Sequence, residues 1–305
     1  MRYRLPLSTS RARGLLAALA IVFTITSAAL AQFGGFDPSF DGELWTVRHQ
    51  LTIADDGVPA GLAFSGGTLF VADSAHHSIV GYNTAGAIVS QWDLTASPAS
   101  DLVPNQLTAT VINVDGADRD ALLLSDRESN RVAAFAAADG TYLFTLRLAR
   151  PANEPTYALS TGQTALSAGA KFNFTSSPPA LTLTGNFAAA WREQWLTGPV
   201  DSGVLAFDGA ASVFQLDGSE FVGTASIVLN GTEGNPVAPA PQNFFGVTFD
   251  TAGNLYALDA FTERLHVYSA AFTRLFTFGT PVAGGGTAEF YEPWGLAFWP
   301  DASGS

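Results

Sequence analysis

The sequence contains no cysteine among its 305 residues. Disulfides, thiolate metal sites and a cysteine nucleophile are therefore excluded. Lysine is nearly absent too: 13 of the 14 basic residues are arginine and one is Lys171, a bias typical of GC-rich bacterial genomes. Charged residues are only 13% of the chain, and 27 acids against 14 bases give a formal charge of −13. A surface of this sign repels phosphate backbones, so nucleic acid is not an expected partner.

Several catalytic motifs are also missing. The chain has no Gly-x-Ser-x-Gly nucleophile elbow, no Gly-x-Gly-x-x-Gly turn and no Walker-type loop. Histidine occurs four times, at His49, His76, His77 and His266. Since zinc sites usually take three or four protein ligands, this scattered set gives little support to a histidine-rich zinc centre, and no metal ligands are assigned.

The N-terminus has the pattern of a secretory signal peptide. Four arginines lie within residues 1–13, an apolar run covers about 15–30, and Ala29-Leu30-Ala31 forms a small-x-small cleavage site. We therefore expect a signal peptide over 1–31, cleavage after Ala31, and a secreted, periplasmic or cell-surface protein with no remaining membrane span. Removal of four arginines from a chain of charge −13 would leave −17. The alternative is an uncleaved membrane anchor, for which the run is marginal in length.

A repeat dominates the rest of the chain. In three segments an Asp closes a short apolar strand, an aliphatic residue follows six positions later, and an aromatic follows nine positions later. The triplets are Asp73, Ile79 and Tyr82; Asp126, Val132 and Phe135; Asp259, Leu265 and Tyr268. A fixed spacing of this kind indicates a repeat architecture.

Each repeat is predicted to be a four-stranded antiparallel unit, because short apolar strands alternate with turns rich in glycine. The expected strands are 61–64, 69–73, 78–82 and 87–92; then 108–114, 121–126, 131–135 and 141–146; and finally 246–249, 254–259, 264–268 and 274–279. Residues 194–207 resemble a degenerate copy of the repeat, in which Gly198 would stand at the Asp position. The long distance between this copy and its neighbours predicts insertions over 151–200. Residues 32–43 are expected to be a flexible leader, followed by a strand over 44–52.

The last expected unit opens at 290–298 and stops after its first strand. A sheet left open in this way exposes unpaired backbone. The repeat region over 44–305 is therefore expected to be partial, incomplete at its C-terminus and part of a longer protein.

The repeats resemble the NHL family of β-propellers. The resemblance rests on Leu69-Phe70-Val71-Ala72-Asp73 with the following His76-His77-Ser78-Ile79, on Asn254-Leu255-Tyr256-Ala257-Leu258-Asp259, and on Glu292-Pro293-Trp294-Gly295-Leu296-Ala297. It implies an all-β protein with about six four-stranded blades around a central channel. Such a resemblance is specific for architecture and says little about activity.

Two readings of the repeated carboxylates Asp73, Asp126 and Asp259 are open. The first makes them structural markers that accept backbone N–H bonds in the turn after the second strand. Their recurrence favours this reading, because a catalytic residue need occur only once. The second reading makes them a ring of oxygen ligands on one face that could hold Ca²⁺.

The loops after the second strands should share one face with the connections between blades, and loops on a rigid scaffold commonly carry binding. The rim predicted there consists of His76, His77, Arg127, Glu128, Asn130, Phe261, Thr262 and Glu263. The expected function is that of an exported scaffold that binds a protein, a small molecule or a glycan through this face. The alternative is a metal-dependent hydrolase or lyase, similar to lactonase-like propellers or amidating lyases, with its site in the central channel.

Overall fold

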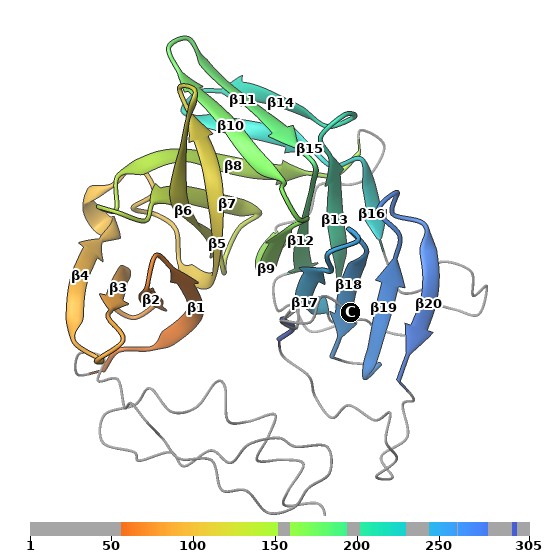
Figure 1. Ribbon diagram of the computed structural model, residues 1–305, viewed down its shortest axis with the longest axis horizontal. Helices are drawn as coiled ribbons and strands as arrows, with labels where there is room; N and C mark the ends of the chain where they lie inside the picture. Colours follow the sequence, from red (N-terminus) through yellow and green to blue (C-terminus); the bar gives the residue numbers. More distant parts are fainter. Residues whose placement is uncertain are drawn as a thin grey trace, which may run out of the picture.

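The computed structural model describes residues 56–151, 159–193, 202–229, 244–260, 262–279 and 295–297. These residues form twenty β-strands and one short 3-10 turn, Leu94–Ala96, which confirms the all-β prediction (Figure 1). The predicted signal peptide, leader and strand over 44–52 lie outside the described residues, as does most of the last unit. Within the described ranges there is no helix with the length and apolar character of a membrane span.

The first blade is an antiparallel sheet of four consecutive strands. They are β1 (Pro59–Ser65), β2 (Thr68–Asp73), β3 (Ser78–Tyr82) and β4 (Ile88–Asp93). The turn between β1 and β2 uses Gly66 and Gly67, both with positive φ, a conformation that glycine adopts without a Cβ clash. The predicted strands are therefore confirmed to within one or two residues at each end.

The second and fourth blades repeat this order. The second has β5 (Pro104–Val114), β6 (Ala117–Asp126), β7 (Arg131–Ala136) and β8 (Tyr142–Ala149). The fourth has β17 (Phe244–Phe249), β18 (Leu255–Asp259), β19 (Arg264–Tyr268) and β20 (Arg274–Phe278). In both, each strand pairs with the next along the chain, as the repeat predicts.

The third blade is interrupted twice. Its sheet consists of β9 (Leu159–Leu166), β12 (Asn186–Glu193), β13 (Ser202–Asp208) and β16 (Ile227–Leu229). The hairpin of β10 (Lys171–Ser176) and β11 (Pro179–Thr184) lies between its first two strands. The hairpin of β14 (Val213–Asp217) and β15 (Glu220–Thr224) lies between its last two.

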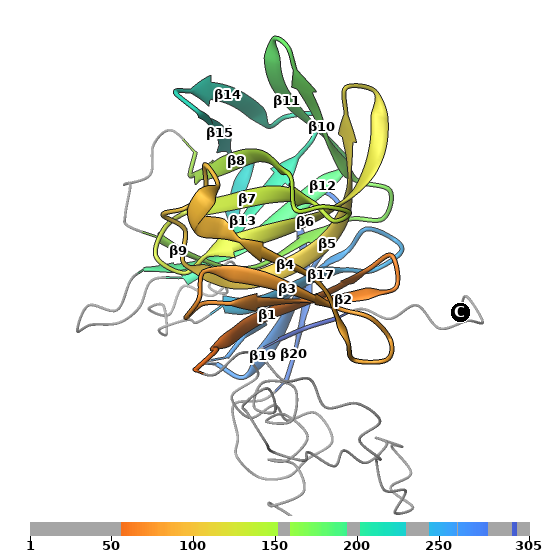
Figure 2. The same ribbon diagram turned by 90° about the vertical axis from the view of Figure 1, so that its left-hand side faces the viewer.

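Both hairpins extend the sheet of the second blade. Strand β10 pairs in parallel with β5 through Phe172 and Ile112, and β15 pairs in parallel with β8 through Phe221 and Leu146. The result is an eight-stranded sheet in the order β11-β10-β5-β6-β7-β8-β15-β14. Figures 1 and 2 show the two hairpins together on one side of the molecule, above the blades. The third blade is thereby attached to the second by main-chain hydrogen bonds as well as by side-chain packing.

Each pair of successive blades is sealed by its own apolar core. The run Ala121-Leu122-Leu123-Leu124 in β6 shows how: Leu122 and Leu124 pack toward the first blade, while Ala121 and Leu123 pack toward the third. A strand buried on both faces reads as a continuous apolar run rather than an alternating one. Two aromatic residues of the repeat triplets pack against the preceding blade: Phe135 faces the first blade and Tyr268 faces the third. Burial of one such side chain contributes roughly 1.5–3 kcal/mol.

Among the apolar cores between described blades, the one between the second and third blades has the most residues and is rich in phenylalanine. Phe144, Phe172 and Phe187 pack with ring centroids 5.2–5.9 Å apart, at the steep angles that aromatic pairs prefer. Phe207, Phe214 and Phe221 complete the cluster from β13 and the second hairpin. Packing alone thus accounts for much of the phenylalanine surplus. Blades that stack in chain order, each sealed to the next, are β-propeller blades, and four are described.

Candidate functional site

The repeated carboxylates lie buried at the ends of the second strands. Asp73 is 1% exposed, and its Oδ1 accepts N–H bonds from Val58 at 2.9 Å, from Ala75 at 3.0 Å and from His76 at 3.3 Å. Its Oδ2 lies 2.7 Å from Nδ1 of His76. Burial opposes ionisation, but these hydrogen bonds outweigh it and hold the pKa of Asp73 below its ordinary value.

Asp126 is held in the same way. Its Oδ1 accepts the N–H groups of Val103 at 3.1 Å and Glu128 at 3.0 Å, and its Oδ2 accepts the Ser129 hydroxyl. Val58 and Val103 each precede the proline that opens the first strand of their blade. In both blades, therefore, the carboxylate connects the loop after the second strand to the segment that enters the blade.

Asp259 also accepts hydrogen bonds from the loop that follows its strand. It is fully buried and accepts the Thr262 N–H at 3.3 Å and the Thr262 hydroxyl at 2.6 Å. Bonds of this kind belong to Asx-type turns. Each of the three carboxylates thus accepts hydrogen bonds from the loop that follows its strand.

The third blade has no aspartate at the position equivalent to Asp73. The pairing of β12 with β13 corrects one assignment made from the sequence. In the other blades the marker aromatic pairs with the residue four positions before the Asp, as Leu69 does with Tyr82. In the third blade Phe187 pairs with Phe207, so Trp191 occupies the Asp position. The assignment of Gly198 to that position was wrong, because sixteen residues rather than nine separate this position from the aromatic. The guanidinium of Arg150 lies 3.8 Å above the Trp191 ring.

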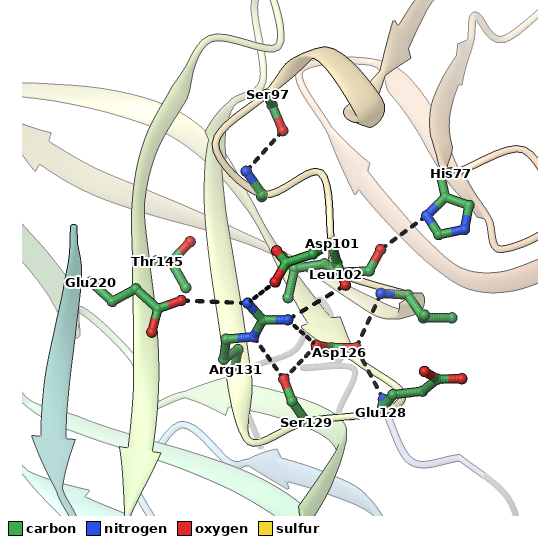
Figure 3. Close-up of polar contacts among 12 residues, drawn as sticks. His77, Ser97, Asp101, Leu102, Asp126, Glu128, Ser129, Arg131, Thr145 and Glu220 are labelled. Atoms are coloured by element: carbon green, nitrogen blue, oxygen red, sulfur yellow. Dashed lines mark hydrogen bonds and ion pairs between the residues drawn. The ribbon is translucent and has the colours of Figure 1, made fainter. Parts of the chain in front are cut away.

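The loop of the second blade is organised around Arg131 (Figure 3). Its guanidinium reaches Asp101 Oδ2 at 2.7 Å, Asp126 Oδ2 at 3.1 Å and Glu220 Oε1 at 3.5 Å. Its Nε donates to Ser129 Oγ at 2.8 Å. Burial alone would lower the pKa of Arg131, but Asp101 and Asp126 raise it above its ordinary value.

These contacts join three parts of the chain. Asp101 lies in the connection between the first two blades, Asp126 ends β6, and Glu220 begins β15 of the inserted hairpin. Only Asp126 was a candidate in the sequence. A usable signal for the arginine did exist, since Arg131 and Arg264 both follow their Asp by five positions. Nothing in the pattern indicated the partners Asp101 and Glu220, because they belong to other units.

Two of the predicted rim residues are part of the framework. Nδ1 of His77 lies 3.1 Å from the Leu102 carbonyl, and His77 has a positive φ of 46°. Nδ2 of Asn130 donates to the Leu148 carbonyl at 2.6 Å. The His77 bond places the loop after β2 beside the connection between the first two blades, and the Asn130 bond joins the loop after β6 to the end of β8.

The other rim residues differ in exposure. The His76 side chain is 42% exposed, and Arg127 and Glu128 are also exposed. Thr262 and Glu263 are half-buried, and Glu263 has a positive φ of 56°, as His77 does at the equivalent position. Phe261 lies outside the described residues. The exposed rim near the second blade thus carries both charges, on Arg127 and Glu128, and the loop beneath them is held by hydrogen bonds to Asp126.

The central channel has a different chemistry. It is a space of about 380 Å³ lined by the innermost strands β1, β5, β9 and β17 and by residues 296–297. The polar side chains facing it are Thr108, Thr110, Gln163, Thr164, Ser167 and Thr248. Among the described lining residues there is no carboxylate or imidazole, so the oxygens offered come from hydroxyls and amides.

Several of these polar groups connect neighbouring inner strands. Thr108 Oγ1 donates to the Thr164 carbonyl at 2.7 Å. Gln163 accepts from Val247 N at 3.2 Å and donates to the Leu296 carbonyl at 2.9 Å. Innermost strands leave one edge without a β-partner, and such bonds satisfy part of that edge. In the described ranges no three His, Asp or Glu side chains come together as metal ligands would.

No family model matches the chain, and no curated protein matches it. Among solved structures, the Dos1 propeller is similar at 12% identity and a TM-score of 0.43, covering 73% of this chain and 48% of that one. Apo AztD from Citrobacter koseri is similar at 14% identity and 0.39, covering 79% and 51%. A streptogramin B lyase is similar at 10% identity and 0.38, covering 84% and 74%. The chain spans about half the length of the Dos1 and AztD chains, and its own blades and seams define the fold.

Proposed function

We propose that this chain is an exported β-propeller of the NHL type that serves as a binding scaffold. Its binding surface would be the strand-two loop face, defined here by His76, Arg127 and Glu128 with the loops that carry them. The observation that carries the proposal is the way buried Asp73 and Asp126 hold those loops. A surface fixed before binding loses less conformational freedom when it meets a ligand.

The composition of the face supports a polar ligand. Arg127 and Glu128 follow the buried Asp126 directly and remain exposed, while Arg131 behind them is paired with carboxylates. Such a surface suits a protein or a small polar molecule such as a glycan, through hydrogen bonds and opposite charges. Export is part of the proposal and rests on the N-terminal sequence. The mature protein recovered from outside the cytoplasm should begin at Gln32.

The alternative, a metal-dependent hydrolase or lyase with its site in the channel, has less support. A metal of this type needs a set of carboxylate or imidazole ligands, and the described channel lining offers hydroxyls and amides. Calcium on the loop face would compete with the N–H donors and the Arg131 guanidinium that already occupy Asp73 and Asp126. Metal analysis of the purified full chain tests both, and a preparation without stoichiometric Ca²⁺ or Zn²⁺ would contradict both.

The test uses two double variants of equal charge change in the second blade. Arg127→Ala with Glu128→Ala alters the loop face. Arg119→Ala with Asp120→Ala alters exposed residues in β6 near the turn at the opposite end of the same blade. On a glycan array, and by photo-crosslinking from position 75 in the exposed loop after β2 to an identified envelope protein, we expect saturable binding that the first variant loses and the second keeps. Equal binding by both variants would refute the loop face as the site.

A further inference from the structure

A second polar site lies on the first blade, on the face turned away from the second blade. It is a pocket of about 290 Å³ formed by β2, β3, β4 and the turn that follows. Its polar lining includes Asp73, His76, Ser78, Gln91 and Asp93. The apolar side chains Val80 and Ile88 form part of its wall. Arginine and lysine are absent from the described lining.

Three of the polar residues form a row across the sheet. Asp73 pairs with Ser78 across β2 and β3, and Ser78 pairs with Asp93 across β3 and β4. Paired residues project their side chains on the same face, with Cβ atoms about 4.5–5.5 Å apart. The hydroxyl of Ser78 therefore lies between two carboxylates.

The Ser78 hydroxyl is the unusual member of this row. Ser78 is only 4% exposed, and its Oγ has no hydrogen-bond partner among the described residues. A buried polar atom without a partner carries an unfavourable desolvation cost, so such atoms are uncommon and call for an explanation. A ligand that donates a hydrogen bond into the pocket would satisfy it.

The groups around this hydroxyl are acceptors. Hydrogen bonds from the Thr95 hydroxyl and N–H lower the pKa of Asp93, and the bonds described above lower that of Asp73. Both carboxylates are therefore negative at neutral pH. Thr95 occupies Oδ1 of Asp93 and leaves its Oδ2 for a ligand. In the tautomer that donates Nδ1–H to Asp73, His76 presents Nε2 as a third acceptor.

We infer that this pocket binds an organic ammonium group, with Ser78 Oγ, Asp93 and His76 Nε2 as acceptors and Val80 and Ile88 against the alkyl part. An ammonium group has three N–H donors, no acceptor and a positive charge. The three donors match the three acceptors of the pocket, and the positive charge matches the negative carboxylates. The group could belong to a small amine or to a lysine side chain. The pocket and the loop face share His76, but this inference does not rest on the loop-face proposal, because Arg127 and Glu128 do not line the pocket and the row Asp73, Ser78 and Asp93 carries it.

The test is a titration of the full chain with n-butylammonium chloride in low-salt buffer, followed by ligand-observed NMR, with n-butanol as the uncharged probe. We expect saturable binding of butylammonium in roughly the millimolar range and no saturable binding of butanol. Ser78→Ala and Asp93→Asn should each weaken binding about five- to tenfold, as expected for a lost hydrogen bond to a charged group.

Asp139→Asn is the matched control. Asp139 accepts the Thr141 N–H at 2.9 Å in the same Asp-x-Thr arrangement, but it lies in the second blade outside the pocket, so binding should be unchanged. Binding of Nα-acetyl-lysine methylamide as well would identify a lysine side chain as the source, and binding of the free amine alone would identify a small amine. The inference is overturned by equal binding of butanol, by no saturable butylammonium binding, or by a Ser78→Ala protein that binds normally. It is also overturned if Ser78→Ala melts well below the wild type, which would show that the hydroxyl already has a structural partner.

Discussion

Replacement of Arg131 by methionine should destabilise the protein more than a surface ion pair would. Methionine keeps the length and apolar character of the stem and removes the guanidinium. The Arg131 side chain is 17% exposed, and its partner Asp126 is 1% exposed. The variant therefore leaves a buried carboxylate without its cation.

The expected loss is about 3–4 kcal/mol in the free energy of unfolding. Removal of one member of a buried ion pair typically costs 3–5 kcal/mol. Asp126 belongs at the lower end, because Val103 N, Glu128 N and the Ser129 hydroxyl remain as donors. The pair with Asp101, whose side chain is 68% exposed, should add less than about 1 kcal/mol. At roughly 2–4 °C per kcal/mol, the melting temperature should fall by about 6–16 °C.

Urea unfolding with two double-mutant cycles separates these contributions. The coupling energy between Arg131→Met and Asp126→Asn should be about 2 kcal/mol, and that between Arg131→Met and Asp101→Asn below about 1 kcal/mol. The reasoning is refuted if Arg131→Met costs less than about 1 kcal/mol. It is also refuted if Asp101 couples to Arg131 more strongly than Asp126 does.

Three further outcomes test other parts of the structure. Gly203→Ala should cost about 2 kcal/mol in urea unfolding, because the new Cβ would lie 2.6 Å from the Leu229 carbonyl; a neutral result would contradict the packing of the third blade. Asn113→Cys with Asn173→Cys should form a disulfide in this cysteine-free chain, since the two positions are parallel partners of β5 and β10; mass spectrometry of the unreduced protein would detect it, and its absence after oxidation would argue against the pairing. Burial, opposed by Asp259 and aided by Arg274 and Arg264, lowers the pKa of His266 to about 4. The unfolded state therefore takes up the proton first, and stability present above about pH 6.5 should decline by about 3 kcal/mol as the pH falls toward 4. His266→Gln should flatten that part of the curve, and a curve as steep as that of the wild type would exclude His266 as the cause.

The sequence predicted the parts of the fold that repeat. The Asp and aromatic markers located the second and third strands of three blades, because a blade buried on both faces needs the same residue types at the same places each time. The bounds of β3 and β19 are those expected from the sequence. Trp191 was missed because the longer separation in the third blade moved the aromatic out of the expected spacing.

The parts that do not repeat could not be predicted in this way. The two hairpins of the third blade pair with β5 and β8, and parallel pairing between distant segments leaves no local pattern in the sequence. The same holds at the loop face, where Arg131 meets Asp101 and Glu220 from two other units. The polar row on the first blade depends on how β2, β3 and β4 pair, and the repeat markers implied this pairing. The sequence did not indicate that the Ser78 hydroxyl would be buried without a hydrogen-bond partner among the described residues.

The central claim is that the buried carboxylates Asp73 and Asp126 hold the strand-two loops to the segments that enter the first and second blades. Hydrogen exchange measured by mass spectrometry on wild type and Asp126→Asn tests it directly, since exchange reports local opening of individual segments. The account predicts faster exchange at Val103 and Glu128, whose amides bond to Asp126, and unchanged exchange at Val58 and Ala75, whose amides bond to Asp73. Unchanged protection at Val103 and Glu128 would contradict it.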